Sequence, residues 1–189
     1  QTTRFEYGSS GRLTATEWPN RVRHEVDYNA AGEPVTLRLL QDHVVEKTLN
    51  STWDSGQLVS RRDADRPGLE EISYDEVGRV KAIHFPEGET IQFERDLRGR
   101  EIKRTYLMAG DDVPLRTLSW FYDAADRAIE WRDDGEVILQ REYDLGLLLT
   151  ETTGNGLKRK FVHDEQSGLL SEVHTNPVDG GWPFLFTTY

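Results

Sequence analysis

The sequence predicts an all-β protein in which one antiparallel meander of about sixteen strands forms a curved open strip. Three features of the chain favour this fold. A short motif that begins with an aromatic residue and an Asp recurs along the chain, and a second set of turn-forming residues lies between its copies. The segments between these turns nearly alternate polar and apolar residues, and none sustains the spacing of an amphipathic helix.

The recurring motif is clearest in the middle of the chain. The segment YDEVGR at residues 74–79 is followed 21 residues later by RDLRGR at residues 95–100. Self-similarity at such a period is typical of repeat proteins. We call each copy an anchor, and residues 1–189 are predicted to be a single array of eight repeats. The leading residues of the anchors are Tyr7, Tyr28, Trp53, Tyr74, Arg95, Tyr122, Tyr143 and His163.

The residue types of an anchor predict a hairpin corner. The Asp can accept hydrogen bonds from backbone N–H groups two residues further on, and the Gly three residues after it can adopt the positive φ of a type I turn with a bulge. The leading aromatic residue supplies cross-strand packing, and the Arg after the Gly can lie over a neighbouring ring. Between Tyr74 and Arg95, we expect Phe85 or Ile83 on the intervening strand to be the packing partner.

Clusters of turn-forming residues separate successive anchors. Two turns per period leave room for two strands of about six to eight residues, and such short turns join neighbouring antiparallel strands. Leu37–Leu39, Ile91–Phe93 and Ile102–Tyr106 have the β-branched and aromatic content of strands. The clusters are residues 18–20, 41–43, 65–68, 86–88, 110–114, 133–135, 154–156 and 176–181.

The composition is that of a polar, acidic chain, with 36% hydrophobic residues, 30% charged residues and a formal net charge of -11. This acidity argues against a nucleic-acid partner. No apolar run approaches the roughly 18 residues that span a bilayer, so membrane insertion is not expected. The chain has no Cys, which excludes disulfides and thiolate metal sites. Both ends resemble the approach to an anchor, so we expect an excerpt of a longer array whose edges pair with its own polypeptide or with another copy.

No residue pattern predicts a catalytic, cofactor or metal site. The histidines have no ligand spacing, and no Gly-x-Ser-x-Gly elbow occurs. Asp111-Asp112 and Asp133-Asp134-Gly135 lack the calcium-loop pattern and are interpreted as solvated turn acids. The segment 154–156 lacks the Lys-Ser/Thr of a phosphate loop and is interpreted as a hairpin turn. The five histidines are His24, His43, His84, His163 and His174.

The tryptophans leave an alternative open. Their flat rings could stack on sugars at the surface, or they could pack across strands. A carbohydrate-binding or adhesion module would expose several rings in one patch, whereas a structural segment would hold them against neighbouring strands. The tryptophans are Trp18, Trp53, Trp120, Trp131 and Trp182.

The anchors resemble the YD repeat of the Rhs family, which includes bacterial polymorphic toxins, the C component of insecticidal Tc toxins and the teneurins. The motif is best matched at residues 74–79, and the similarity covers nearly the whole chain. The departures are Trp53, Arg95 and His163 at the Tyr position, Gly8 and Asn29 at the Asp position, and Asp126 at the Gly position.

The resemblance implies a structural segment of a hollow β-shell that encloses or presents a toxin or effector domain. Its partner would be the remainder of its own polypeptide, with glycans as partners under the adhesion alternative. The family also implies a secreted or cell-surface location in bacteria. Many of its shells end in a self-cleaving segment with an Asp-Pro dipeptide. This sequence has no Asp-Pro, so that activity is not carried over and no enzymatic activity is expected.

Overall fold

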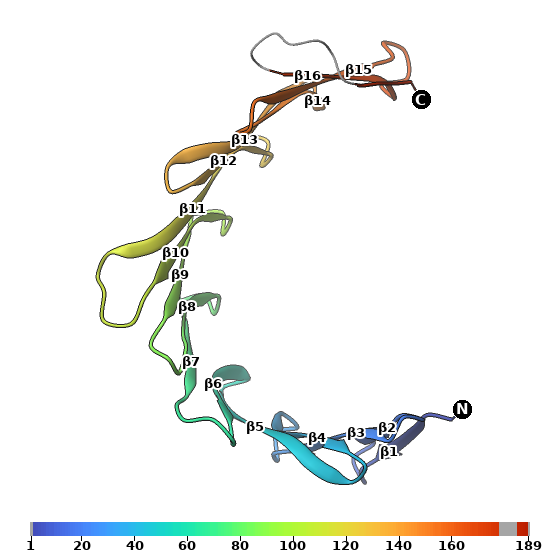
Figure 1. Ribbon diagram of the computed structural model, residues 1–189, viewed down its shortest axis with the longest axis vertical. Coiled ribbons are helices and arrows are strands. Elements are labelled where there is room, and N and C mark those ends of the chain that lie inside the picture. Colours follow the sequence, from blue (N-terminus) through green and yellow to red (C-terminus); the bar gives the residue numbers. More distant parts are fainter. Residues whose placement is uncertain (1, 178–184, 189) are drawn as a thin grey trace. The chain divides into compact units, whose positions relative to one another are not determined.

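The computed structural model describes residues 2–177 and 185–188 as an all-β chain without helices (Figure 1). The predicted fold class is confirmed, and the described residues form seventeen strands. No described segment could cross a membrane as a helix. The strands are β1 (Arg4–Tyr7), β2 (Leu13–Glu17), β3 (Val22–Tyr28), β4 (Pro34–Gln41), β5 (Val44–Asp54), β6 (Gln57–Asp63), β7 (Glu70–Tyr74), β8 (Val80–His84), β9 (Thr90–Arg95), β10 (Glu101–Leu107), β11 (Pro114–Tyr122), β12 (Ala128–Asp133), β13 (Glu136–Asp144), β14 (Leu147–Thr153), β15 (Leu157–His163), β16 (Leu170–Pro177) and β17 (Leu185–Thr188).

Each strand pairs antiparallel with the strand that follows it in the chain, which gives one open sheet. Short connections explain this topology, because they leave no chain for a crossover between distant strands. The continuous meander predicted from the alternating turns is confirmed. The curvature of the strip stays a prediction.

The chain comprises two compact units. The first contains Gln1–Gln92 and Met108–Asp111, and the second contains Phe93–Leu107 and Asp112–Tyr189. Strand β9 contributes its first residues to the first unit and its last residues to the second. The single array of eight repeats stays a prediction.

In the first unit, one sheet face carries rows of aliphatic side chains. Residues directly opposite each other on neighbouring strands point to the same face. Branched side chains suit such a pleated surface, which explains why these segments form strands. The rows are Val26, Leu37 and Leu49 across β3 to β5, and Ile72, Ile83 and Ile91 across β7 to β9.

The other face of the first unit is charged. Arg23 on β3 donates to Glu6 at 2.7 Å and to Glu25 at 2.8 Å. Arg38 on β4 pairs with Asp27 and lies 3.7 Å from Glu25. These opposite charges alternate across neighbouring strands, so they support strand pairing.

The second unit shows the same division of residue types. Trp120, Trp131 and Leu139 lie in a row across β11 to β13. On the opposite face, the Glu130 carboxylate accepts a hydrogen bond from the Gln140 amide at 2.7 Å. The division is incomplete, because Phe121 lies opposite Glu130 on the second face and Arg141 lies over Trp131 on the first.

Few of the described side chains are buried. The buried apolar residues among them are Ala15, Leu40 and Ala82. Neither unit therefore has a dry core between two packed layers in its described part. Backbone ladders and cross-strand pairs, rather than a thick core, hold the sheet together.

The turns between anchors lie where the sequence places them. Asp42 and His43 form a two-residue turn with φ values of 50° and 68°, and Asp134 and Gly135 form another with 47° and 86°. Positive φ at both central positions matches the right-handed twist of the flanking strands. The last predicted cluster is wrong in its described part, because Asn176 and Pro177 belong to β16, and residues 178–181 lie outside the described residues.

Candidate functional site

All eight anchors lie between consecutive strands, which confirms that they are hairpin corners. At the fourth corner, Asp75 accepts hydrogen bonds at Oδ1 from the N–H groups of Val77, at 3.1 Å, and of Arg79, at 2.9 Å. The other carboxylate oxygen, Oδ2, accepts a hydrogen bond of 2.8 Å from Arg79 Nε. Gly78 has a φ of 81° and donates its N–H to the Asp75 carbonyl at 3.0 Å. This is the predicted type I turn with a bulge.

The same geometry recurs at the fifth and sixth corners. The carboxylates of Asp96 and Asp123 each accept hydrogen bonds from two backbone N–H groups. Each also accepts a hydrogen bond of 2.7 Å from the Nε of the Arg four residues later. The repeated residue types therefore build the same corner, as expected for an Asp that caps a turn.

These hydrogen bonds lower the pKa of the three corner carboxyls. For Asp75 and Asp123 the largest cause is the backbone N–H of the following Arg, and for Asp96 it is the side chain of that Arg. A carboxyl with a lowered pKa in the folded state adds stability above its ordinary pKa. That stability is lost as the pH falls through the folded value.

Two corners are one residue shorter and use a different turn. Ser55 and Gly56 have φ values of 50° and 80°, and Leu145 and Gly146 have 45° and 89°. In each case the two connected strands stay hydrogen-bonded up to the residues immediately before and after the two-residue turn. Positive φ at both positions is typical of a type I′ turn. The shortened copies thus keep the corner but change its backbone.

At three anchors, the leading Tyr joins its corner to the preceding one. Its hydroxyl donates to the backbone carbonyl two residues after the Gly of the preceding corner. The strand that leaves one corner pairs with the strand that enters the next, so the ring reaches this carbonyl directly. The pairs are Tyr28 with Leu13 at 2.8 Å, Tyr74 with Leu58 at 2.8 Å, and Tyr122 with Glu101 at 2.9 Å.

Trp53 keeps this bond although it replaces the Tyr. Its indole Nε1 donates to the Pro34 carbonyl at 2.8 Å, and Pro34 also lies two residues after the Gly of the preceding corner, Gly32. Trp suits the position because it combines a flat ring with a single N–H donor. The departure at Trp53 is therefore chemically conservative.

An arginine of the preceding corner lies over the ring of several leading tyrosines. This arginine follows the Gly position of the motif, as predicted, and at the sixth corner that position is Asp126. A guanidinium within about 6 Å of a ring centroid is attracted by the ring face. The distances to the ring centroid are 5.9 Å for Arg12 over Tyr28, 4.5 Å for Arg100 over Tyr122, and 4.4 Å for Arg127 over Tyr143.

The residue after the Gly also reaches the turn of the next corner. Gln57 Nε2 donates to the Gly78 carbonyl at 3.1 Å, and a Cβ on Gly78 would lie 2.9 Å from that nitrogen. A Cβ on Gly32 would lie 1.9 Å from Arg12 Nη2. These glycines therefore provide space for a neighbouring side chain as well as the positive φ of the turn.

Asp126 explains the one departure at the Gly position. It adopts a φ of 66°, which is uncommon for a residue with a side chain. Its carboxylate accepts hydrogen bonds from Arg98 and Arg100 of the preceding corner, both at 2.6 Å. Asp tolerates this backbone region better than most residues, and here its charge also links two corners.

The prediction that Phe85 or Ile83 packs against Tyr74 is wrong. Val80 lies opposite Tyr74, whereas Ile83 lies opposite Ile72, and Phe85 follows at the far turn beyond β8. The bulge after the Gly fixes this register, so the partner comes from the start of the intervening strand rather than from its end. The constant offset from Gly to the carbonyl acceptor could have identified these contacts from the sequence.

Trp120 and Trp131 face each other across β11 and β12. Arg104 lies 5.5 Å from the Trp120 ring centroid, and Arg141 lies 5.2 Å from that of Trp131. The two rings thus take part in cross-strand packing with arginine guanidinium groups, as the structural interpretation expects.

The other described tryptophans also have structural partners. Trp18 meets the His24 ring edge-on at 4.7 Å, and Trp53 is held by its indole hydrogen bond. All four described tryptophans are half-buried, and Trp182 lies outside the described residues. Carbohydrate binding stays an untested alternative.

The turn acids are more engaged than expected. Asp133 binds Arg116 through both oxygens at 2.9 and 2.6 Å, and Asp134 Oδ1 accepts the Thr117 N–H at 2.6 Å. Asp134 is exposed and Asp133 is half-buried, so the interpretation as solvated turn acids holds for Asp134, but both acids also fasten their turn to β11. Asp111 lies in the connection between β10 and β11, and Asp111-Asp112 are exposed as expected.

The remaining candidates are dispersed. Residues 154–156 form the predicted turn, in which Gly156 donates to the Thr153 carbonyl at 3.0 Å. His84 Nδ1 lies 2.9 Å from Thr90 Oγ1, and the buried Nδ1 of His163 has no hydrogen-bond partner. Within residues 2–177 and 185–188, no three His, Asp or Glu residues are placed to hold a metal ion.

Comparison with known proteins identifies the fold. No family model and no curated protein matches the sequence. The structure of TcdB2-TccC3 without its hypervariable C-terminal region matches with a TM-score of 0.72 and 14% identity over 99% of this chain. The TcdB2-TccC3 structure matches with a TM-score of 0.71 and 15% identity over 99% of this chain. The TcdB2-TccC3-Cdc42 structure matches with a TM-score of 0.67 and 14% identity over 92% of this chain. The chain spans about a tenth of those chains, 10 to 11%.

Proposed function

We propose that this chain is a wall segment of a YD-repeat β-shell that encloses or presents a toxin or effector domain. The observation that carries the proposal is the set of contacts between successive corners, in which Tyr122 and its equivalents bind the backbone of the preceding repeat. The fold shared with the TcdB2-TccC3 structures supports the same conclusion.

The corner contacts suit a wall for a physical reason. In a repeat array, stability is the sum of each repeat and its interfaces with its neighbours. Tyr hydroxyl bonds at three junctions and Arg–ring contacts at three strengthen those interfaces without a second layer of structure. The sheet can therefore be extended while it stays one layer thick, with polar groups in contact with water.

The proposal assigns no catalytic step to these residues. The partner is the remainder of the same polypeptide, including its cargo, and the proposed location is secreted or at a bacterial cell surface. The support for these assignments is the resemblance of the anchors to the YD repeat together with the shared fold.

Proteolysis of the intact gene product tests the proposal. We expect a segment outside the repeats to resist proteinase K in the intact protein, and to be cleaved rapidly when it is expressed alone. Mass spectrometry of the fragments identifies the protected segment. Equal cleavage rates in both settings would contradict enclosure. Binding of the chain to a glycan array would instead favour the adhesion alternative.

A further inference from the structure

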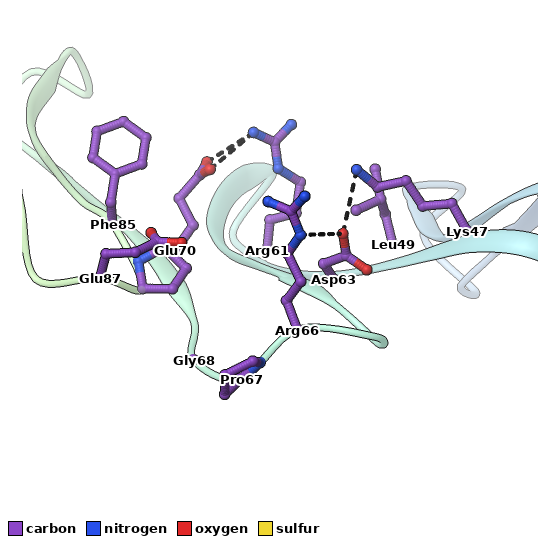
Figure 2. A pocket seen from close by; sticks show the side chains of 11 residues that line it. Lys47, Leu49, Arg61, Asp63, Arg66, Pro67, Gly68, Glu70, Phe85 and Glu87 are labelled. Atoms are coloured by element: carbon purple, nitrogen blue, oxygen red, sulfur yellow. Dashed lines mark hydrogen bonds and ion pairs between the residues drawn. The ribbon is translucent and has the colours of Figure 1, made fainter.

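A pocket of about 370 Å³ opens in the first unit beside the connection between β6 and β7 (Figure 2). These strands pair only through Ser60 with Glu71 and Arg61 with Glu70 in the described residues. The chain then departs from the sheet over residues 64–69. This volume lies within the range of small-ligand sites, about 300 to 1,000 Å³.

The loop beside the pocket is held in place. Ala64 donates its N–H to the Thr48 carbonyl at 2.8 Å. Gly68 lies so close to Pro86 that a Cβ on it would be 2.5 Å from the Pro86 Cβ. A site held in this way loses little conformational entropy on binding.

Three cations reach the pocket from different elements, and two of them lie close to a carboxylate. Arg61 Nη2 donates to both oxygens of Glu70 at 3.0 Å. Lys47 Nζ lies 3.2 Å from Asp63. Figure 2 shows these pairs on either side of Arg66.

Arg66 is the cation that remains open to a ligand. Its Nε lies 3.9 Å from Asp63, beyond hydrogen-bonding distance, and its side chain is 74% exposed. Asp63 already accepts the Asp65 N–H at 3.2 Å and pairs with Lys47, and these contacts, the Asp65 hydrogen bond first, hold the pKa of Asp63 below the ordinary value. A second carboxylate could therefore bind Arg66 without breaking a close ion pair.

Glu87 also lines the pocket, and apart from this carboxylate the remaining wall is apolar. Phe85, Pro86, Pro67 and Leu49 line the pocket, and Phe85 is half-buried at its margin. An aromatic ring and two proline rings offer a surface for one apolar group beside the guanidinium.

We propose that this pocket binds a carboxylate that carries one apolar group of amino-acid size, with Arg66 on the carboxylate and Phe85 on the apolar group. A guanidinium matches a carboxylate through two parallel hydrogen bonds, which fixes its orientation. The carboxylate can belong to a free acylated amino acid or to the C-terminal residue of a peptide. This inference does not depend on the shell proposal.

Isothermal titration of the 189-residue chain tests the site with N-acetyl-phenylalanine. We expect saturable binding that is lost with N-acetyl-phenylalaninamide, which lacks the carboxylate. Arg66→Gln and Phe85→Ala should each weaken binding at least fivefold. Arg62→Gln is the control, because Arg62 follows the pocket-lining Arg61 on β6, so its side chain points to the opposite sheet face and should leave binding unchanged.

Two further measurements complete the test. A tripeptide that ends in Phe with a free carboxylate should bind at least as tightly as N-acetyl-phenylalanine if the source is a peptide end, and more weakly if it is a free acid. Melting temperatures of the variants show that they are folded. Absence of binding, or equal binding by Arg66→Gln and the unmodified chain, would overturn the proposal.

Discussion

The Arg100 guanidinium carbon lies 4.5 Å from the ring centroid of Tyr122, and the Tyr122 hydroxyl donates to the carbonyl of Glu101, the residue after Arg100. One side chain therefore meets both a cation and a backbone acceptor of the preceding corner. Burial raises the pKa of Tyr122, so its hydroxyl remains a donor at neutral pH. This junction contains the contacts that most directly couple one repeat to the next.

Removing the Tyr122 hydroxyl should weaken the second unit. Tyr122→Phe keeps the ring and leaves the Glu101 carbonyl without its donor, so we expect a loss of about 1 kcal/mol in the free energy of unfolding. Urea denaturation measures this change. Tyr7→Phe is the control, because Tyr7 is 64% exposed and should change stability by less than about 0.5 kcal/mol. Equal effects of the two substitutions would show that the hydroxyl bond contributes nothing.

Gly78 should tolerate no β-branched residue. Gly78→Val combines a φ of 81° with a contact at 2.9 Å to Gln57, so we expect a loss of about 1 to 2 kcal/mol or more. Gly110→Val has a similar φ of 78° but open space around its Cβ, and it should cost less. Thermal melts compare the two. If Gly78→Val melts at the unmodified temperature, the role assigned to this corner is wrong.

Acid should weaken the corners. The lowered pKa of Asp123 means that its contribution to stability is present at neutral pH and is lost as the pH falls below the ordinary value of 3.8. Asp123→Asn should therefore be less stable than the unmodified chain at neutral pH, and the difference should shrink in acid. Denaturation at a series of pH values measures this trend. A difference that stays constant with pH would contradict it.

Asp126 should link two corners through its charge. Asp126→Asn keeps a residue that accepts positive φ but loses the charged contacts with Arg98 and Arg100. Because these side chains are partly exposed, we expect a loss of about 0.2 to 1 kcal/mol at low salt and a smaller loss at high salt. The comparison of unfolding free energies at two ionic strengths tests this. A loss that is independent of salt would indicate a purely steric effect.

The strands could be predicted from the sequence because turn-forming residues mark both ends of each strand. The Asp and Gly of anchors such as residues 75–79 specify their turns locally, and β-branched residues such as Ile72 and Ile91 form the strands between them. Strand order then follows, since short connections allow only neighbouring strands to pair.

The contacts between corners were harder to predict. The carbonyl acceptors, such as Leu58 for Tyr74, depend on the bulge that sets the register, and no side-chain type identifies a backbone acceptor. For the same reason, Phe85 was misplaced by sequence reasoning. Asp126 could be recognised only as a departure, because its two arginine partners come from another repeat.

A double-mutant cycle on Arg100 and Tyr122 tests most directly whether neighbouring repeats are coupled at their corners. The unfolding free energies of Arg100→Gln, Tyr122→Leu and the double variant are compared with that of the unmodified chain. The cycle cancels the other contacts of Arg100, including those with Asp96 and Asp126. We predict a coupling energy of about 0.5 to 1.5 kcal/mol. A coupling energy of zero would contradict the account.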